Sequence, residues 1–155
     1  MNRNIKISAD ISDNDWGCRV LIYGFFDSNE NMWKSGYAKM KGVEFENCGQ
    51  YNSTGAGLKI HNVGNDNNGI VTIIENSVFR NCLGMCLFIK DSSNLQISNN
   101  ILFNGLKYLV FVEGMQNEFN FTDNLLIGVF KSDKFANFGN NNDDEVAVYK
   151  QIAST

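Results

Sequence analysis

The sequence predicts an all-β fold, a right-handed parallel β-helix with about 4–5 coils of 23–24 residues each. Three observations lead to this prediction: a short motif that recurs at a nearly constant interval, a second apolar triplet that recurs in step with it, and a proline-free composition rich in asparagine. The motif reads apolar-x-polar-x-x-apolar-x-Asn, with Gly in place of the final Asn in the last copy. Its four copies are Met40–Asn47, Ile74–Asn81, Ile97–Asn104 and Phe121–Gly128.

The intervals between these copies separate a β-helix from other all-β folds. Ile74 and Ile97 are 23 positions apart, and Ile97 and Phe121 are 24 apart. A second triplet recurs with the same period, as Leu58–Ile60, Leu87–Ile89 and Val110–Val112. A β-sandwich also contains many short strands, but it would not be expected to repeat equivalent residues at a constant interval. The motif positions place four side chains in one inward-facing column: Phe45, Phe79, Leu102 and Leu126.

The composition agrees with long runs of paired backbone and polar corners. There is no proline, which would remove a ladder hydrogen bond. Asparagine tolerates left-handed backbone and therefore suits the corners between strands, although a compositional bias of the source is an alternative explanation of its abundance. The asparagines beside the apolar triplets are Asn62, Asn76, Asn81, Asn99, Asn100, Asn104 and Asn124. With a net charge of −4 and no basic cluster, nucleic acid is not expected as a partner.

We predict a single domain over residues 1–155. Residues 1–35 form an irregular first coil or cap, residues 36–130 form the regular coils, and residues 131–155 form a polar loop with a candidate last strand at Val146–Tyr149. The first full coil is longer, 34 residues from Met40 to Ile74, because of two polar insertions at Gly49–Thr54 and Val63–Gly69. Such insertions are either functional loops or tolerated variation.

The repeat also places the candidate site residues. Outward-facing positions on successive coils bring His61, Lys90 and Glu113 into one row, which either binds or protonates an acidic sugar or is an ordinary ion-paired surface column. Phe88 and Phe111 face outward on the same sheet, either as an exposed aromatic pair or covered by the first coil. One histidine and scattered carboxylates do not make a metal site, and no cofactor is expected.

Cysteines and sequons suggest an extracellular protein. Cys48 and Cys82 each follow a Phe-x-Asn element, so they are expected level with each other on adjacent coils, as a disulfide or as buried free thiols. Asn52 and Asn120 begin N-glycosylation sequons. No apolar run is long enough to span a membrane, and the N-terminus lacks the pattern of a signal peptide. We therefore expect the chain to be a segment of a longer protein.

Four stretches resemble the β-helix region of the fibrocystin-like family of large cell-surface proteins: RNIKI, GCRVLIYGF, SGYAKMKGVEFENCGQ and AGLKIHNVGN, within residues 2–130. The most specific of these are the RNI opening and Gly42–Gln50. The region is similar, more distantly, to that of the cell-surface hyaluronidases, which carry a His-x-His element where this chain has Lys59-Ile60-His61. Because Lys59 stands in the place of the first histidine, the resemblance implies a binding role more than hyaluronan cleavage.

These observations lead to two functional hypotheses. The first is an extracellular structural or binding module of a cell-surface protein, with a possible ciliary location implied by the resemblance. Its partners would be neighbouring coils or domains of the same protein and a glycan or protein ligand. The second is a carbohydrate-active enzyme, of the hyaluronidase or polysaccharide-lyase kind, on the same scaffold. The fold alone does not decide between them, and the shortage of outward carboxylates beside His61 favours the first.

Overall fold

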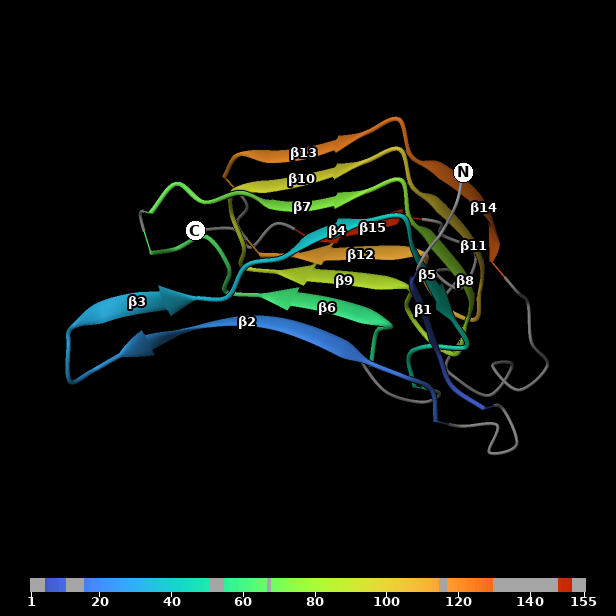
Figure 1. The fold of residues 1–155 in the computed structure, drawn as a ribbon, viewed down its shortest axis with the longest axis horizontal. Coiled ribbons are helices and arrows are strands. Elements are labelled where there is room, and N and C mark those ends of the chain that lie inside the picture. The colour runs from blue at the N-terminus through green and yellow to red at the C-terminus, as the bar shows by residue number, and fades with distance from the viewer. Residues whose placement is uncertain are drawn as a thin grey trace.

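A computed structural model of the chain describes residues 5–10, 16–50, 55–66, 68–114, 117–129 and 148–151. All regular structure among these residues is β-strand, and most strands are four or five residues long, as the repeat predicts (Figure 1). The strands are β1 (Ile5–Ser8), β2 (Val20–Asp27), β3 (Met32–Ser35), β4 (Lys39–Lys41), β5 (Val43–Glu46), β6 (Leu58–His61), β7 (Thr72–Glu75), β8 (Val78–Cys82), β9 (Leu87–Lys90), β10 (Leu95–Ser98), β11 (Ile101–Gly105), β12 (Val110–Glu113), β13 (Phe119–Thr122), β14 (Leu125–Val129) and β15 (Val148–Gln151).

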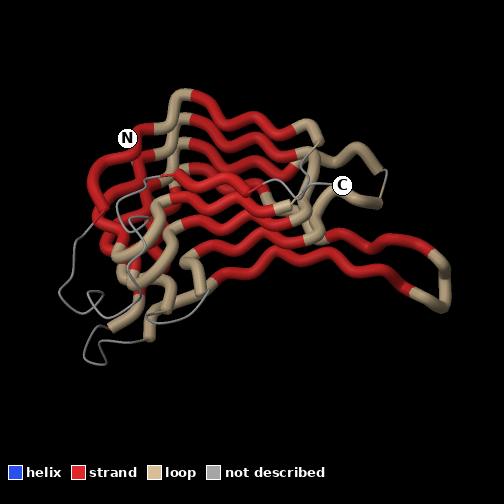
Figure 2. Tube along the Cα trace, turned by 180° about the vertical axis from the view of Figure 1, so that it is seen from behind, coloured by secondary structure: helices blue, strands red, loops and turns tan. Residues whose placement is uncertain are grey.

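The strands form three sheets, and every pair except β2–β3 is parallel. Sheet A has the order β1-β5-β8-β11-β14, sheet B the order β15-β12-β9-β6-β2-β3, and sheet C the order β13-β10-β7-β4. Apart from β3, consecutive strands visit sheets A, B and C in turn, and each such set of three is called a coil below. Figure 2 shows the same layers from behind. This repeating path through three parallel sheets is the arrangement that the sequence repeat predicts.

The core column predicted from the motif is confirmed. Phe45 lies opposite Phe79 in the sheet A ladder, Phe79 opposite Leu102, and Leu102 opposite Leu126. The Phe45 and Phe79 rings stack with centroids 4.6 Å apart and planes 4° apart. The first three side chains of the column are fully buried, and Leu126, near the end of the sheet, is partly buried against the same core.

Left-handed residues occupy the corners, as the asparagine distribution predicts. After the strands of sheet C the positive-φ positions are Gly42, Asn76, Asn99 and Asp123, and along sheet A they are Asn47, Asn81, Asn104 and Gly128. Glycine alternates with Asn and Asp because these residues adopt this conformation at the lowest cost. Asn100 and Asn124 differ from the expectation, since neither has a positive φ. Their side chains instead form a hydrogen-bonded ladder, with Asn124 Oδ1 accepting from Asn100 Nδ2 at 3.0 Å.

The first coil contains a feature that the repeat did not predict. β2 continues past the end of β6 and turns back into β3, so that Gly24–Asp27 pairs with Met32–Ser35 in an antiparallel hairpin. The hairpin projects to the left of the coils in Figure 1. It replaces the corner between sheets B and C, which in the third coil takes only the four residues 91–94. The predicted last strand at Val146–Tyr149 is found slightly later, as β15.

The cysteine pairing differs from the one considered from the sequence. Cys48 and Cys82 do lie level on adjacent coils, because the Leu83 N–H donates to the Cys48 carbonyl at 2.8 Å in the continuing ladder. However, Cys48 is bridged to Cys18 of the first coil and Cys82 to Cys86. A Cys48–Cys82 disulfide is therefore wrong for this structure. Cys18 and Cys48 are also parallel bridge partners, and this register could not be counted through the irregular first coil.

Candidate functional site

The outer face of sheet B carries most of the predicted site residues, in two rows that cross the strands. In the row nearer the strand ends, Tyr23 of β2 lies opposite His61 of β6, His61 opposite Lys90 of β9, and Lys90 opposite Glu113 of β12. The predicted His61–Lys90–Glu113 row is therefore present, and Tyr23 extends it by one coil. The residues alternate with inward-facing core residues, as the period of two along a strand requires.

Contacts within this row divide it into two pairs. Lys90 Nζ lies 2.7 Å from Glu113 Oε1, and this contact is the main reason that the pKa of Lys90 is raised. The ring of Tyr23 meets that of His61 edge to face, with centroids 5.3 Å apart. The ion-paired column considered from the sequence is thus present for Lys90 and Glu113. His61 instead has an aromatic neighbour, and no carboxylate in the described part of the chain forms an ion pair with it.

The second row contains Leu21, Lys59, Phe88 and Phe111, again in register from β2 to β12. Phe88 and Phe111 are in edge contact at 5.2 Å. The expectation of an exposed aromatic pair is wrong for Phe88, which is only 4% exposed. No described residue of the first coil belongs to the cluster that covers it. Phe88 packs in a small outer cluster with Ala56, Met85, Tyr108 and Phe111.

Lysine packing adds to this outer cluster. The Lys59 ammonium lies 4.9 Å from the centre of the Phe88 ring, and that of Lys107 lies 5.7 Å from the centre of the Tyr108 ring. Both are cation–π contacts. The outer face of sheet B therefore combines packed aromatic rings with ammonium groups that lie above them. Sequence reasoning placed Phe88 and Phe111 but missed Lys59 and Tyr108 as parts of this surface.

The electrostatics of this face indicate an excess of positive charge. Burial lowers the pKa of Lys59, and the nearby charges of Arg19 and Lys90 lower it further. Burial also lowers the pKa of His61, followed by the charges of Lys59 and Lys90. Glu113 counteracts both shifts only in part. Cations therefore repel each other on this part of an otherwise acidic chain, and an anion placed between them would relieve the repulsion.

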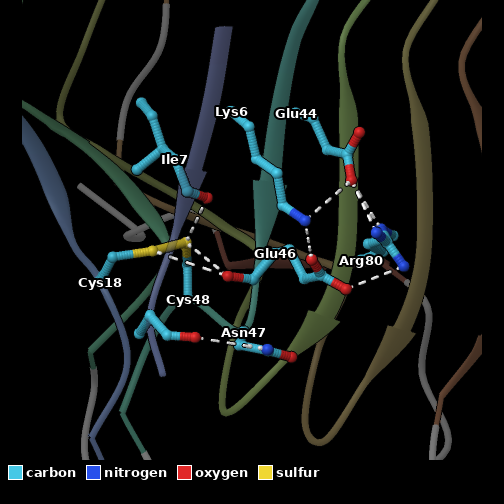
Figure 3. Close-up of polar contacts among 9 residues, drawn as sticks. Lys6, Ile7, Cys18, Glu44, Glu46, Asn47, Cys48 and Arg80 are labelled. Atoms are coloured by element: carbon cyan, nitrogen blue, oxygen red, sulfur yellow. Dashed lines mark hydrogen bonds and ion pairs between the residues drawn. A yellow bond between two sulfur atoms is a disulfide. The ribbon is translucent and has the colours of Figure 1, made fainter. Parts of the chain in front are cut away.

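A second charged cluster lies on the outer face of sheet A and was missed from the sequence (Figure 3). Glu44 and Glu46 of β5 stand between Lys6 of β1 and Arg80 of β8. The Arg80 guanidinium lies 2.8 Å from a carboxylate oxygen of each glutamate, and Lys6 is paired with Glu46. The hydrogen bond from Lys6 is the largest cause that lowers the pKa of Glu46, and the charge of Arg80 adds to it. The Glu-x-Glu pattern of β5, level with Arg80, is the sequence feature from which this cluster could have been predicted.

The remaining predicted sites are placed as follows. Asn120 is exposed on β13, whereas Asn52 lies outside the described residues. Within the described ranges, no group of three or more histidine, cysteine or acidic side chains is arranged to hold a metal ion. The same part of the chain contains no helix with the length and apolarity of a membrane span.

Comparisons with known proteins agree with this architecture. A family described as CEMIP beta-helix matches residues 30–153, which include most of the coils and both rows of the sheet B face except their β2 members. Searches of curated proteins and of solved structures found no match. Since the match extends over most of the sequence, this chain belongs to the CEMIP beta-helix family.

Proposed function

We propose that this chain is an extracellular binding module that holds an anionic glycan on the outer face of sheet B and does not cleave it. The observation that carries the proposal is the cationic and aromatic composition of that face. Lys59, Lys90 and His61 lie on two neighbouring coils, in two adjacent rows. Burial lowers the pKa of Lys59 and repulsion from Arg19 and Lys90 lowers it further, so an anion bound beside Lys59 would stabilise its charged form.

The spacing of the face suits a linear polymer. Neighbouring strands lie about 4.8 Å apart, so the side chains of a row form a straight track across the coils. Phe111 and Tyr108 supply flat apolar surface, with ring centroids 5.3 Å apart, on which the apolar face of a sugar ring could lie. Ammonium groups at Lys59 and Lys90 could pair with the carboxylates or sulfates of successive sugars. The ligand class that fits is therefore an acidic polysaccharide.

The carboxylates support binding more than hydrolysis. Glycoside hydrolysis uses two carboxyl groups, one of which stays protonated as the general acid because its pKa is raised. On the described outer faces, Glu44 and Glu46 both pair with Arg80, Glu75 pairs with Lys41 at 3.1 Å, and Glu113 pairs with Lys90. The pKa of Glu46 is lowered and not raised. Each of these four carboxylates thus has a cationic partner, which favours a structural or binding role over hydrolysis.

The wider context is part of the same proposal. We infer that the coils wind in the right-handed sense, because parallel strands joined through a crossover are right-handed in nearly all known cases. The two disulfides are consistent with an oxidising compartment outside the cytosol. The fibrocystin-like resemblance suggests that the parent is a large cell-surface protein, with a cilium as one location to examine.

The binding proposal is tested with a hyaluronan oligosaccharide and a neutral oligosaccharide of equal length as probes. The double variant Lys59→Ala/Lys90→Ala removes two ammonium groups from the face, and Lys39→Ala/Lys41→Ala removes two from sheet C as a control of equal charge. By calorimetry at low salt, we expect wild type and control to bind only the acidic probe. The Lys59/Lys90 variant should bind at least about tenfold more weakly, a loss of about 1.4 kcal/mol.

Two results would contradict the proposal. One is the absence of binding to the acidic probe by wild type at low salt. The other is an equal loss of affinity in both double variants, which would show that net charge and not this face governs binding. Release of reducing ends or unsaturated sugars during the same incubation, abolished by His61→Ala, would instead support the enzymatic alternative.

A further inference from the structure

The hairpin of the first coil is an arm that leaves the body of the molecule. The arm is defined here as residues 24–35, from the second half of β2 through β3. Only the first half of β2, Val20–Tyr23, is held by β6. The second half has β3 as its partner and extends beyond the ends of the other strands of sheet B (Figures 1 and 2).

The arm and its base expose an unusual amount of apolar surface. Five large side chains there are roughly half exposed: Leu21 59%, Tyr23 46%, Phe25 50%, Phe26 48% and Met32 45%. Phe26 has the inward-facing parity of Ile22, but it lies past the end of the coil, where no core covers it. Its ring meets that of Trp33 of β3 edge to face, with centroids 5.7 Å apart. Both faces of the arm therefore present aromatic surface.

The base of the arm is fixed to the coils. The Gly36 N–H donates to the Tyr23 carbonyl at 3.0 Å, and the Gly64 N–H of the second coil donates to Ser35 Oγ at 2.9 Å. The Tyr37 hydroxyl donates to the carboxylate of Asp66 in the same second-coil loop. The exposed surface is thus held in place before any partner arrives, which lowers the entropic cost of docking.

The charges of the arm are opposite to those of the sheet B face. Asp27 and Glu30 lie at its turn, and Lys34 is paired with Glu30, so the arm carries an excess of one negative charge. On the described outer surface of sheet B and beside it, Arg19, Lys59, Lys90 and Lys107 outnumber Asp91 and Glu113. An acidic, aromatic arm and a cationic, aromatic face are complementary in both respects.

We propose that the arm is a self-association element that lies on the outer face of sheet B of a second copy of this chain. Arm and face belong to the same molecule, so a two-fold axis lets each copy cover the other, and the assembly closes as a dimer. Leu21, Tyr23, Phe25 and Met32 share one side of the hairpin, opposite to Phe26. Large side chains bury about 150–250 Å² each, so these four, half exposed, offer about 800 Å² in two copies. The faces that they cover add a similar area, which brings the total into the range of specific interfaces.

The dimer would compete with a glycan for the same face, but it does not depend on glycan binding. Self-association is measured with no sugar present, and the binding test above uses variants outside the arm. Repeating the glycan measurement with Phe25→Ser/Phe26→Ser, in which no dimer should cover the face, lets each proposal fail alone. If both hold, an acidic polysaccharide should dissociate the dimer.

Sedimentation velocity of the purified chain tests the proposal. The arm variant Phe25→Ser/Phe26→Ser removes two exposed rings, and Leu125→Ser/Ile127→Ser removes two equally exposed apolar side chains from β14, far from the arm in the chain. We expect wild type and the β14 control to dimerise below about 100 μM, and the arm variant to dimerise at least about tenfold more weakly. A third variant, Glu30→Lys, should also weaken the dimer, and this loss should diminish at high salt.

Thermal unfolding followed by circular dichroism checks that each variant folds. Glu30→Lys, at an exposed position, keeps the test valid if the ring variant does not fold. A wild type that stays monomeric at about 100 μM would overturn the proposal. A dimer that survives both arm variants would overturn it as well. Loss of the dimer in the β14 control alone would place the association at the end of sheet A instead.

Discussion

Replacing Asn100 with alanine should remove one of the main supports of the corner between sheets C and A. Asn100 is 1% exposed, and its side chain serves three neighbours. Oδ1 accepts the Ser77 N–H at 2.9 Å, while Nδ2 donates to the Ile74 carbonyl at 2.9 Å and to Asn124 Oδ1 at 3.0 Å. One amide thus joins three consecutive coils.

The magnitude follows from the three hydrogen bonds that alanine would remove. The Ser77 N–H lies in a buried residue and would lose its acceptor, whereas the Ile74 carbonyl lies within β7 between two parallel partner strands and would lose one of its hydrogen bonds. An unsatisfied buried polar group costs about 1–3 kcal/mol and an ordinary hydrogen bond contributes about 0.5–1.5 kcal/mol, so the Ser77 N–H and the bonds to Ile74 and Asn124 together amount to about 2–6 kcal/mol. Because a whole domain is stable by only about 5–15 kcal/mol, this loss would be easy to see.

Equilibrium unfolding in urea measures the effect, with Asn99→Gly as the matched control. Asn99 is the adjacent residue, but it is exposed and has a φ of 56°, which glycine adopts without strain. We expect Asn99→Gly to stay within about 0.5 kcal/mol of wild type and Asn100→Ala to lose at least about 2 kcal/mol. Equal stabilities for the two variants would refute the reasoning that this ladder, and not the corner conformation alone, holds the coils together.

Two further predictions address the core and the pH dependence. Phe79→Ala removes one ring of the buried Phe45–Phe79 stack and should cost about 3–5 kcal/mol of stability. Phe79→Leu, which matches Leu102 in the next coil, should cost much less. Equal urea midpoints for the two variants would contradict this prediction. The pKa of His61 is lowered in the fold, so below pH 6.5 His61 is protonated to a greater extent in the unfolded chain than in the folded chain. The free energy of unfolding should therefore fall as the pH decreases. His61→Gln should make the melting temperature depend less on pH between pH 7.5 and about 5.5. An unchanged pH dependence would contradict the assignment to His61.

The regular coils could be predicted because two periods act together. Alternation within a strand decides which side chains face inward, and a constant interval decides which residues lie opposite one another. A shift of one residue would turn Phe79 outward, so the apolar pattern admits a single register. The same reasoning places His61 opposite Lys90 and Lys90 opposite Glu113, as the structure has them.

Features outside the repeat could not be derived in this way. The arm lies in the first coil, where the motif does not recur and no interval is available for counting, so its antiparallel pairing could not be derived. Phe88 has outward parity, but Met85 and Tyr108 come from corner segments that fold over it, and a strand pattern carries no information about such cover. The pairing of Cys48 with Cys18 depends on the same uncounted coil.

The length of the connection between sheets B and C is the main difference between this molecule and a regular stack of coils. Between sheets B and C, the first coil inserts the arm, the second inserts residues 62–71, and the third needs only residues 91–94. The two insertions contact each other through Ser35 and Gly64, and the second contacts the third coil where the Ser93 N–H donates to the Val63 carbonyl at 2.7 Å. Because both insertions lie outside the parallel ladders, the corner can lengthen while the register of those ladders stays the same. It therefore builds a projecting surface beside the cationic face of sheet B, where a partner can touch both at once.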